Sequence, residues 1–374
     1  MWIYEQKEWP DLTWNSEKIS SGLVSVRHQQ GRLLGRMEAL GFDLKQEASL
    51  NMLTNDIVKT SAIEGQSLNP KEVRSSIARR LGIDIGGLIS VSRNVEGIVE
   101  IMLDATQNFK APLTKERLFD WHAALFPTGR SGMKKITVGN WRTPEAGSMQ
   151  VISGSIGKEK IHFQALDAKR IDKEMSMFLD WFETESDIDS VLKAGLAHLW
   201  FITIHPFEDG NGRIARAIAD MALARSDDTA ERFYSMSSQI EIERKDYYEQ
   251  LEKQQRSTTD ITEWLEWFLG CLGRAIVKAE ETLSIVLYKD KLWEKINKKP
   301  VNERQRLIIN RMLEDFKGHM STSKYAKLAK CSTDTALRDI QGLTKRKILI
   351  QNEGSGRSTS YSLINNSDLD QIVT

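Results

Sequence analysis

The sequence predicts a mainly α-helical protein with one β-hairpin and a separate C-terminal domain of helices and two strands. Through most of the chain, apolar side chains recur at spacings of three and four residues, which is the period of an amphipathic helix. Residues 136–164 depart from this period, because β-branched residues there cluster around glycine and serine, a pattern that favours a hairpin. A helix expected to end near Tyr288 is then followed by a charged connector over residues 289–301, which ends near Pro300 and indicates a domain boundary.

The composition is that of a globular protein without a preference for polyanions. The 374 residues contain 52 lysines and arginines and 52 acidic residues, so the formal net charge is zero and no global field favours nucleic acid or a membrane surface. The two cysteines are too few for a disulfide framework. The sequence has neither an apolar run of about 20 residues nor a signal peptide. We expect a soluble, cytoplasmic protein that is long enough for two or three domains.

One loop carries most of the polar chemistry of the chain. The apolar runs 194–204 and 214–225 flank it, and both are long enough and periodic enough to be buried helices. Between them, the segment His205-Pro-Phe-Glu-Asp-Gly-Asn-Gly-Arg-Ile-Ala-Arg216 contains a proline and two glycines, which interrupt the helical pattern. A tight loop with a histidine, an aspartate and an asparagine therefore joins two buried helices, and two arginines follow on the second one.

Each residue type in this loop suits one part of a phosphate-transfer site. Glycines let backbone N–H groups converge on an anion, and the N-terminus of the following helix adds its positive dipole end. Arg213 and Arg216, three residues apart, project from one face of that helix and suit phosphate oxygens. Asp209 could hold a magnesium ion that bridges phosphates, and His205 has an unperturbed pKa near neutrality, which suits a general base. Together these groups indicate nucleotidyl or phosphoryl transfer to a hydroxyl.

The same segment resembles the signature of the Fic (filamentation induced by cAMP) family, His-x-Phe-x-Asp/Glu-Gly-Asn-Gly-Arg-x-x-Arg, and matches it at every defined position. Members of this family typically transfer AMP from ATP to a serine, threonine or tyrosine hydroxyl of a target protein. The resemblance implies that His205 deprotonates the target hydroxyl and that Asp209 binds Mg²⁺. Phe207 would anchor the loop in the core. The phosphates of ATP would be held by Gly210, Asn211, Gly212, Arg213 and Arg216.

A second motif lies upstream, in a predicted helix over residues 46–66. Its end, Thr60-Ser-Ala-Ile-Glu-Gly65, has a glycine where helices commonly have a C-cap, and capping alone would explain it. It also resembles the inhibitory motif of the Fic family, Ser/Thr-x-x-x-Glu-Gly/Asn. The resemblance implies autoinhibition, in which Glu64 pairs with Arg216 and withholds it from the γ-phosphate of ATP. A reverse, deAMPylating reaction, in which Glu64 positions a water that removes AMP, is an alternative.

The N-terminal extension, residues 1–90, contains this inhibitory helix and begins with an arm rich in tryptophan. Its opening, Trp2-Ile-Tyr-Glu-Gln-Lys-Glu-Trp-Pro10, resembles a domain of unknown function found on one bacterial branch of the family. Tryptophan rings suit a core or a subunit interface better than a ligand site, and a homodimer is compatible with this arm. Residues 91–288 then form the expected Fic catalytic core.

Within this core, the predicted hairpin has its turn near residues 154–158. In the Fic family a hairpin at this place clamps the target segment by strand addition, so the resemblance implies a flap next to His205. A structural hairpin that only covers helices is the alternative. Arg142, just before the hairpin, fits either a contact with the site or a place on the surface.

Four further ring side chains of the core are of interest. Tyr247 and Tyr248 follow the loop on a later helix, and family members commonly close the adenine pocket with a tyrosine from this region. Either one is a candidate for binding adenine, and core packing is an equal alternative. His122 and His198 have no neighbours at metal-ligand spacing, so we expect them to pack in the core.

The C-terminal region, residues 300–374, resembles a winged helix-turn-helix domain. Helices are predicted over 302–316, 321–329 and 332–343, and two strands flank a glycine-rich turn at 354–357. The resemblance implies that the third of these helices is a recognition helix for the major groove of DNA.

Side chains on and after this third helix could contact DNA. Those expected near the bases or the phosphates are Thr333, Thr335, Arg338, Lys345, Arg346, Lys347 and Arg357. Asp334 and Asp339 on the same helix weigh against DNA. A protein-interaction or dimerisation module with the same fold is therefore an equal alternative.

Two functions from different classes follow. The first is an ATP- and Mg²⁺-dependent protein adenylyltransferase, autoinhibited by Glu64, that modifies a target protein and itself. The second is a DNA-binding transcriptional regulator whose Fic core senses nucleotide without catalysis, and such a sensor would not need His205. Transfer of UMP or phosphocholine is a third alternative, because the loop binds the diphosphate and does not determine which base is attached to it. A purely structural loop would explain neither the glycines nor Asp209.

Overall fold

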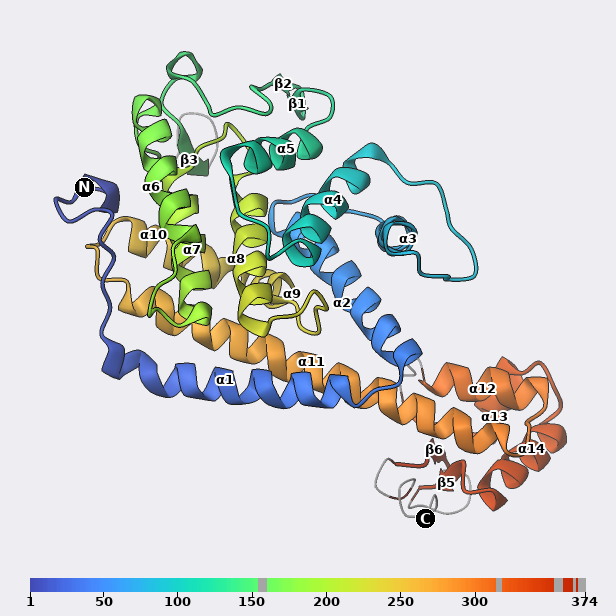
Figure 1. Ribbon diagram of the computed structural model, residues 1–374. Coiled ribbons are helices and arrows are strands. Elements are labelled where there is room, and N and C mark those ends of the chain that lie inside the picture. Colours follow the sequence, from blue (N-terminus) through green and yellow to red (C-terminus); the bar gives the residue numbers. More distant parts are fainter. Residues whose placement is uncertain (154–159, 314–317, 353–358, 366–367, 369–374) are drawn as a thin grey trace. The chain divides into compact units, whose positions relative to one another are not determined.

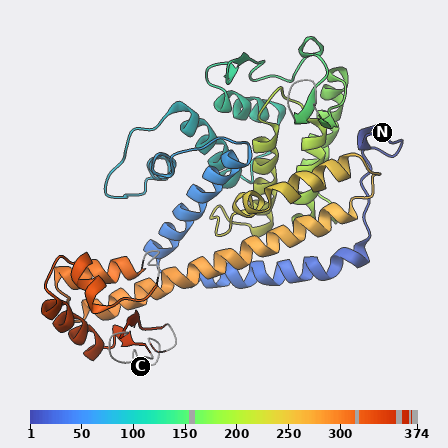
Figure 2. The same ribbon diagram turned by 180° about the vertical axis from the view of Figure 1, so that it is seen from behind.

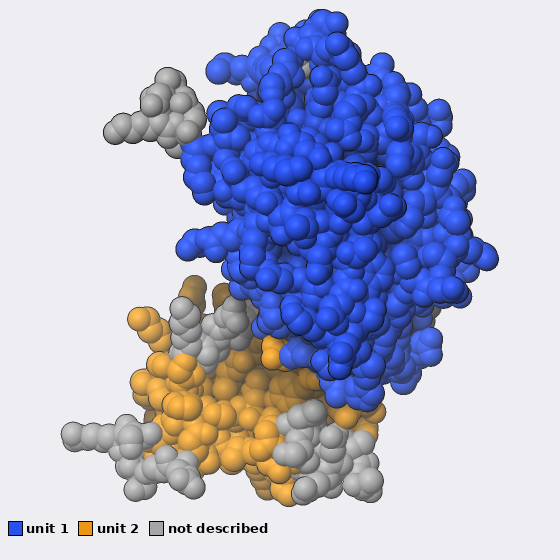
Figure 3. All heavy atoms as spheres, turned by 90° about the vertical axis from the view of Figure 1, so that its left-hand side faces the viewer, with its two compact units in different colours: residues 1–280 blue, residues 281–374 orange. Residues whose placement is uncertain are grey.

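The computed structural model describes residues 1–153, 160–313, 318–352, 359–365 and 368 (Figure 1). These residues are mainly helical, which confirms the predicted fold class, and the described strands form three separate antiparallel pairs. The chain divides into two compact units, Met1–Glu280 and Glu281–Thr374, which Figure 3 shows in different colours. No described helix has the length and apolar character needed to cross a lipid bilayer.

Unit 1 is built almost entirely from helices. They are α1 (Ser16–Glu38), α2 (Phe42–Ile63), α3 (Pro70–Leu81), α4 (Arg93–Gln107), α5 (Lys115–Leu125), α6 (Ile171–Glu183), α7 (Ser190–Ile204), α8 (Asn211–Asp227), α9 (Met236–Ile242), α10 (Arg244–Gln255) and the first part of α11 (Thr262–Asn297). Five of these helices begin at a polar side chain that accepts a hydrogen bond from the first turn, namely Asn15, Asn69, Thr114, Asp189 and Ser235. Local capping chemistry therefore sets several of the helix starts.

The helices α7 and α8 form the centre of unit 1 and run side by side (Figures 1 and 2). Every residue of α7 from Ala194 to Ile204 is buried, which its apolar sequence on all faces predicts. Gly195 allows α11 to approach closely, because a Cβ there would lie 3.1 Å from side-chain atoms of Leu265 and Phe268. This tight packing fixes α7, the helix that leads into the loop before α8.

The N-terminal arm packs against the same core. Trp9 Nε1 donates a hydrogen bond to Glu174 at 2.8 Å, and its ring meets Trp200 edge to face. The ring of Trp2 meets Phe163 in the same manner. Both tryptophans are partly buried within unit 1 itself, as expected of a packing role.

Two antiparallel strands, β3 (Gln150–Ser153) and β4 (Lys160–Gln164), confirm the predicted hairpin. Its predicted turn at residues 154–158 lies outside the described residues. A further pair, β1 (Arg130–Ser131) and β2 (Lys134–Lys135), has no counterpart among the predicted elements, because strands of two residues leave no periodic signal.

The expectation of a connector at residues 289–301 is wrong over most of its length. The helix α11 does not end near Tyr288 but continues almost to Pro300. Leu292 and Ile296, four residues apart, are fully buried, so the amphipathic period extends through the charged stretch. Lysine and glutamate are themselves good helix formers, which is why charge alone did not mark a linker.

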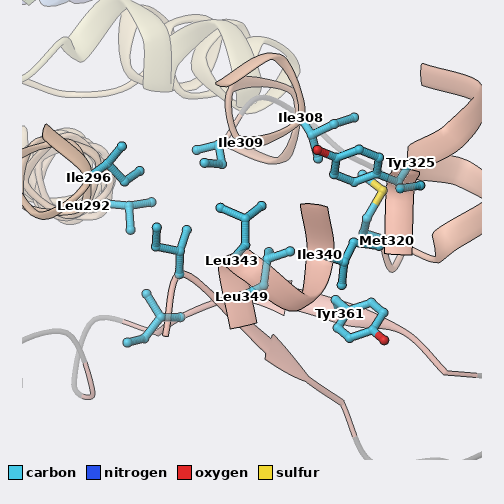
Figure 4. Close-up of a cluster of buried hydrophobic side chains, with 13 residues drawn as sticks. Leu292, Ile296, Ile308, Ile309, Met320, Tyr325, Ile340, Leu343, Leu349 and Tyr361 are labelled. Atoms are coloured by element: carbon cyan, nitrogen blue, oxygen red, sulfur yellow. The ribbon is translucent and has the colours of Figure 1, made fainter. Parts of the chain in front are cut away.

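In the described residues of unit 2, the end of α11 is followed by three helices and two strands, in the predicted order. They are α12 (Glu303–Leu313), α13 (Thr322–Leu328), α14 (Thr333–Lys345), β5 (Leu349–Gln351) and β6 (Tyr361–Leu363). The strands β5 and β6 pair antiparallel, and Met320 bridges to Tyr361. Figure 4 shows the apolar core that these elements share with the end of α11. The predicted turn at residues 354–357 lies outside the described residues.

Candidate active site

The loop between α7 and α8 has two residues in the left-handed region. His205 ends α7 with φ 53° and ψ 58°, and its N–H donates to Phe201 O at 3.0 Å. Gly210, the N-cap of α8, has φ 82°, and a Cβ at this position would lie 3.0 Å from the side chains of Leu125 and Phe126. Glycine is therefore required at position 210 for both backbone conformation and space.

Asn211 closes the loop on itself. Its Oδ1 accepts a hydrogen bond from Phe207 N–H at 3.0 Å, and its Nδ2 donates to Phe207 O at 2.8 Å. Phe207 is fully buried and stacks on His122, with ring centroids 4.1 Å apart and planes 7° apart. Both polar atoms of the Asn211 side chain, expected near the phosphates of ATP, thus bond the loop backbone.

His122 supports the loop in a way that its sequence position does not indicate. Its Nδ1 accepts from Gly139 N–H at 3.2 Å, and its Nε2 lies 3.2 Å from Asp209 O. Because a carbonyl oxygen only accepts, Nε2 carries the proton. Burial lowers the pKa of His122 to about 4, so the ring is neutral at neutral pH. The expectation of core packing is confirmed, and the ring also holds the backbone at Asp209.

His205 is buried, with 9% of its surface exposed, and its protonation state follows from its surroundings. Nδ1 lies 3.2 Å from Ile202 O, an acceptor, so Nδ1 carries the proton and Nε2 has a free lone pair. No described residue forms a hydrogen bond with Nε2. Burial, with a smaller contribution from the charge of Arg142, lowers the pKa of His205 to about 4. The imidazole is therefore neutral at neutral pH and can accept a proton at Nε2.

The carboxylate of Asp209 is 42% exposed beside the N-terminus of α8. One of its oxygens accepts from Gly210 N–H at 2.5 Å, and the other accepts from the Ser131 hydroxyl. Arg213 Nη2 lies 3.7 Å from Asp209. An accessible carboxylate next to arginines that can hold phosphate suits Mg²⁺, which commonly binds through one or two carboxylates plus phosphate oxygens.

Arg213 and Arg216 are both buried, and each has one side-chain nitrogen without a hydrogen-bond partner among the described residues. Arg216 donates to Thr60 Oγ1 at 2.7 Å, to Thr60 O at 2.9 Å and to Glu64 Oε1 at 2.8 Å. Arg213 Nη1 donates to Gln66 Oε1 at 2.9 Å. The buried atoms Arg213 Nε and Arg216 Nη1 have no hydrogen-bond partner among the described residues. Two buried, unpaired cationic donors at a helix N-terminus suit an anion.

Glu64 occupies the space next to the loop. Its Oε1 would lie 2.2 Å from a Cβ on Gly212, so a side chain at position 212 would displace the carboxylate from this place. Burial is the largest single influence on the pKa of the Arg216 guanidinium and lowers it, but the charge and hydrogen bond of Glu64 together with Tyr247 and Tyr248 outweigh burial, so the net shift of the pKa is upward. The backbone beside Glu64 is fixed by Arg244 Nε, which donates to Ile63 O at 2.6 Å.

The two candidate tyrosines occupy different environments. Tyr247 is 1% exposed, and its hydroxyl lies 2.9 Å from His198 Nε2. Tyr248 is 36% exposed, and its hydroxyl lies 3.4 Å from Glu64 Oε2. Tyr248 therefore faces the loop region, while Tyr247 packs with His198, whose expected core location is confirmed.

The hairpin lies next to the catalytic candidate. The ring centroid of Phe163 on β4 is 6.2 Å from that of His205. On β3, Val151 and Ile152 are 37% and 54% exposed. Among the described residues β3 pairs with β4 alone, so its other edge is available to a further strand.

Comparisons with known proteins agree with this geometry. Residues 112–223 match the model of the Fic/DOC family, and residues 2–83 match a domain of unknown function, DUF4172. The chain is 25% identical over 173 residues to protein adenylyltransferase fic-1 of Caenorhabditis elegans, a match that covers 46% of this chain and 31% of that protein. It is 32% identical over 108 residues to protein adenylyltransferase Fic of Nematostella vectensis, which covers 28% of this chain and 23% of that protein. The matches thus span about a third or less of these relatives.

Solved structures share the fold. A Fic family protein from Desulfovibrio desulfuricans G20 superposes with a TM-score of 0.52 at 19% identity, over 92% of this chain and 96% of that one. A Fic domain containing signaling protein from Bacteroides thetaiotaomicron gives a TM-score of 0.52 at 18% identity, over 70% of this chain and 98% of that one. Residues 112–223 thus match a Fic/DOC domain, the described residues share the fold of these solved Fic proteins, and residues 2–83 match a domain of unknown function.

Proposed function

We propose that this protein is an adenylyltransferase that moves AMP from ATP to a hydroxyl of a target protein and to a hydroxyl of its own chain. The observation that carries the proposal is the neutral His205 with its free Nε2. It begins a loop that is followed, on α8, by two buried arginines, each with one donor nitrogen that has no partner among the described residues. The names of the curated relatives support the same activity.

The proposed chemistry uses each group of the loop once. His205 Nε2 takes the proton of the acceptor hydroxyl, whose oxygen attacks the α-phosphorus of ATP, and the bond to the β-phosphate breaks to release diphosphate. Arg213 and Arg216 neutralise the phosphates, together with backbone N–H groups at the start of α8. Asp209 would hold Mg²⁺, which neutralises phosphate charge when bound.

We also propose that Glu64 inhibits this reaction from within the same chain. Its ion pair with Arg216 at 2.8 Å uses a donor that phosphate would otherwise receive. Three of the four hydrogen bonds made by the two arginine side chains go to Thr60 and Glu64, and the fourth goes to Gln66. The segment at the end of α2 thus competes with the outer phosphates of ATP.

The free edge of β3 is the proposed contact for the target protein. An extended segment that adds to this edge would gain backbone hydrogen bonds and cover Val151 and Ile152. Because β4 brings Phe163 next to His205, such a segment would lie near the general base.

The test is covalent labelling with ATP that carries the label on its α-phosphate, in the presence of Mg²⁺. We expect weak labelling of the wild-type protein, strong labelling of Glu64→Gly and none of Glu64→Gly with His205→Ala. Absence of label in all three, despite measurable ATP binding, would contradict the proposal and favour a nucleotide sensor or another donor. Loss of label from pre-labelled protein only when Glu64 is intact would indicate the deAMPylating alternative.

A second candidate function, binding of double-stranded DNA by unit 2, is favoured by the distribution of charge. Residues 281–374 contain 17 lysines and arginines and 11 acidic residues, a net charge of +6. Residues 1–280 contain 35 and 41, a net charge of −6. The zero net charge of the chain thus conceals a basic C-terminal unit, and a basic unit that resembles a winged helix-turn-helix suits DNA.

Asp339, which weighed against DNA, does not lie on the outer face of α14. It is 8% exposed and accepts hydrogen bonds from Arg304 Nε at 2.9 Å and from Tyr325 OH at 3.2 Å. Arg346, which was expected near the phosphates of DNA, instead donates hydrogen bonds to the backbone carbonyls of Ile296 and Lys299, at and just after the end of α11. The exposed residues of α14 include Asp334, Leu337, Arg338, Gln341 and Lys345.

Fluorescence anisotropy with a labelled duplex tests this candidate in the full chain. We expect binding that weakens as salt rises, and weaker binding for Arg338→Ala and Lys345→Ala than for Lys7→Ala in the N-terminal arm. Equal affinity of all three variants, or no binding at low salt, would leave a protein partner or a second copy as the occupant of this face.

A further inference from the structure

Arg142 is a buried arginine without an acidic partner. It is 3% exposed, and no carboxylate among the described residues forms an ion pair with it. Burial lowers the pKa of its guanidinium. A charged side chain buried in this way persists only where its donors are used, so its hydrogen bonds identify what it does.

Three hydrogen bonds of Arg142 go to backbone carbonyls around the candidate active site. Its N–H donates to Pro206 O at 2.9 Å, its Nε donates to His205 O at 2.9 Å, and its Nη2 donates to Leu166 O at 2.6 Å. Leu166 lies two residues after β4, the strand of the hairpin next to His205. One side chain therefore joins the start of the catalytic loop to the base of the hairpin.

The bond to His205 O bears directly on the strained residue of the loop. His205 is not glycine, yet it has φ 53° and ψ 58°, a region that costs energy for a residue with a side chain. Such a conformation persists only where several contacts enforce it. The angle ψ determines where the carbonyl of His205 points, and Arg142 bonds that carbonyl and the next one along the chain.

We propose that Arg142 is a positioning residue that holds His205 in the left-handed conformation required for proton transfer at Nε2. This role rests on the proposed adenylyltransferase function. Arg142 acts through the carbonyl of His205, and it places the imidazole so that Nδ1 meets Ile202 O while Nε2 stays free. Because the same guanidinium binds Leu166 O, the position of the base is also coupled to the hairpin that lies next to it.

The kinetic test compares Arg142→Lys and Arg142→Gln, both in the active Glu64→Gly background. The ATP contacts assigned to Arg213 and Arg216 do not involve Arg142, so we expect KM for ATP to change less than twofold. A misplaced base slows the chemical step, so kcat should fall about 10- to 100-fold in Arg142→Gln and less in Arg142→Lys, which keeps a long, charged donor.

Arg117 supplies a matched control. It is also a partly buried arginine that donates to several backbone carbonyls, among them Ala111 O at 2.8 Å and Asp104 O at 3.0 Å. None of its bonds reaches the loop or the hairpin, so Arg117→Lys and Arg117→Gln should leave kcat unchanged even where they lower thermal stability. An equal fall of kcat in the Arg117 and Arg142 variants would overturn the positioning role.

A second measurement does not depend on catalysis. The ¹⁵N chemical shifts of the histidine rings report which nitrogen carries the proton, and His205→Asn identifies the resonance among the six histidines. We expect His205 to be protonated at Nδ1 in the wild type and the Arg117 variants, and to populate both tautomers in Arg142→Gln. An unchanged Nδ1 tautomer in Arg142→Gln would contradict the proposal. If Glu64→Gly shows no transfer, the adenylyltransferase proposal fails while this spectroscopic result still decides the role of Arg142.

Discussion

Gln66 Oε1 accepts a hydrogen bond from Arg213 Nη1 at 2.9 Å, so the segment that follows α2 binds the first arginine of the loop as well as the second. The family motif accounts for Glu64 and Arg216 but not for this contact. Since a phosphate would have to displace Gln66 from Arg213, the amide is a second competitor with ATP.

Replacing Gln66 with alanine should therefore release Arg213 and raise AMP transfer. A hydrogen bond to a charged group contributes about 1.5 kcal/mol, so we expect a rise of up to about tenfold, below that of Glu64→Gly. Labelling with α-labelled ATP measures it. Gln107→Ala is the control, because its amide donates to Ala230 O away from the loop. Equal label in Gln66→Ala and wild type, with a clear rise in Glu64→Gly, would show that Arg216 alone limits the rate.

The close approach of α4 and α5 should make Gly97 intolerant of any side chain. A Cβ on Gly97 would lie 1.8 Å from Ala124 O, a backbone atom that cannot move without shifting α5. We expect Gly97→Ala to lower the free energy of unfolding by about 1–3 kcal/mol, as overpacked substitutions do. Gly31→Ala is the control, since a Cβ there meets nothing within 4 Å and alanine favours the helix. Urea denaturation of both variants measures the difference, and equal stability would contradict it.

Three buried neutral histidines should make stability fall as the solution is acidified. Burial lowers the pKa of His122 to about 4, of His198 to about 3 and of His205 to about 4. Between the unfolded value near 6.5 and about 4, the unfolded chain binds protons that the folded chain does not bind. Each histidine thus contributes fully to the free energy of unfolding above its unfolded pKa. Below that pKa the contribution falls by up to about 1.4 kcal/mol per pH unit.

His122→Gln tests this linkage. Glutamine keeps a donor and an acceptor but does not titrate, so the free energy of unfolding should depend less steeply on pH between 6.5 and 4 than in the wild type. Urea denaturation at several pH values measures both slopes, and identical slopes for wild type and His122→Gln would contradict the assignment of a neutral His122.

Asp339 should be needed for the stability of unit 2. Its carboxylate accepts from Arg304, Asn302 and Tyr325, so Asp339→Ala leaves the buried hydroxyl of Tyr325 without its acceptor. We expect a loss of about 1–3 kcal/mol, as for other unsatisfied buried polar groups. Asp334→Ala on the exposed side of α14 should change stability by less than about 0.5 kcal/mol. Thermal unfolding of the two variants measures both losses of stability. A larger loss for Asp334→Ala than for Asp339→Ala would contradict the burial of Asp339.

The sequence alone determined the helical class, the loop between α7 and α8 and the residue types that the loop presents. These features depend on periodicity and on short motifs, which are properties of neighbouring residues. The hairpin over residues 150–164 was predictable for the same reason. The length of α11 was not, because its charged end looks like a linker until Leu292 and Ile296 are seen to be buried.

Only the tertiary structure decided which distant residues meet the loop. Gln66 and Arg213 are 147 residues apart, and Arg142 and His205 are 63 apart, so neither contact leaves a local pattern. The same holds for His122, which looks like a core residue on α5 but bonds the backbone of Asp209. A motif specifies the chemistry that a loop can perform, while the groups that hold or block it come from packing between remote segments. That packing depends on burial and close approach, which local sequence does not encode.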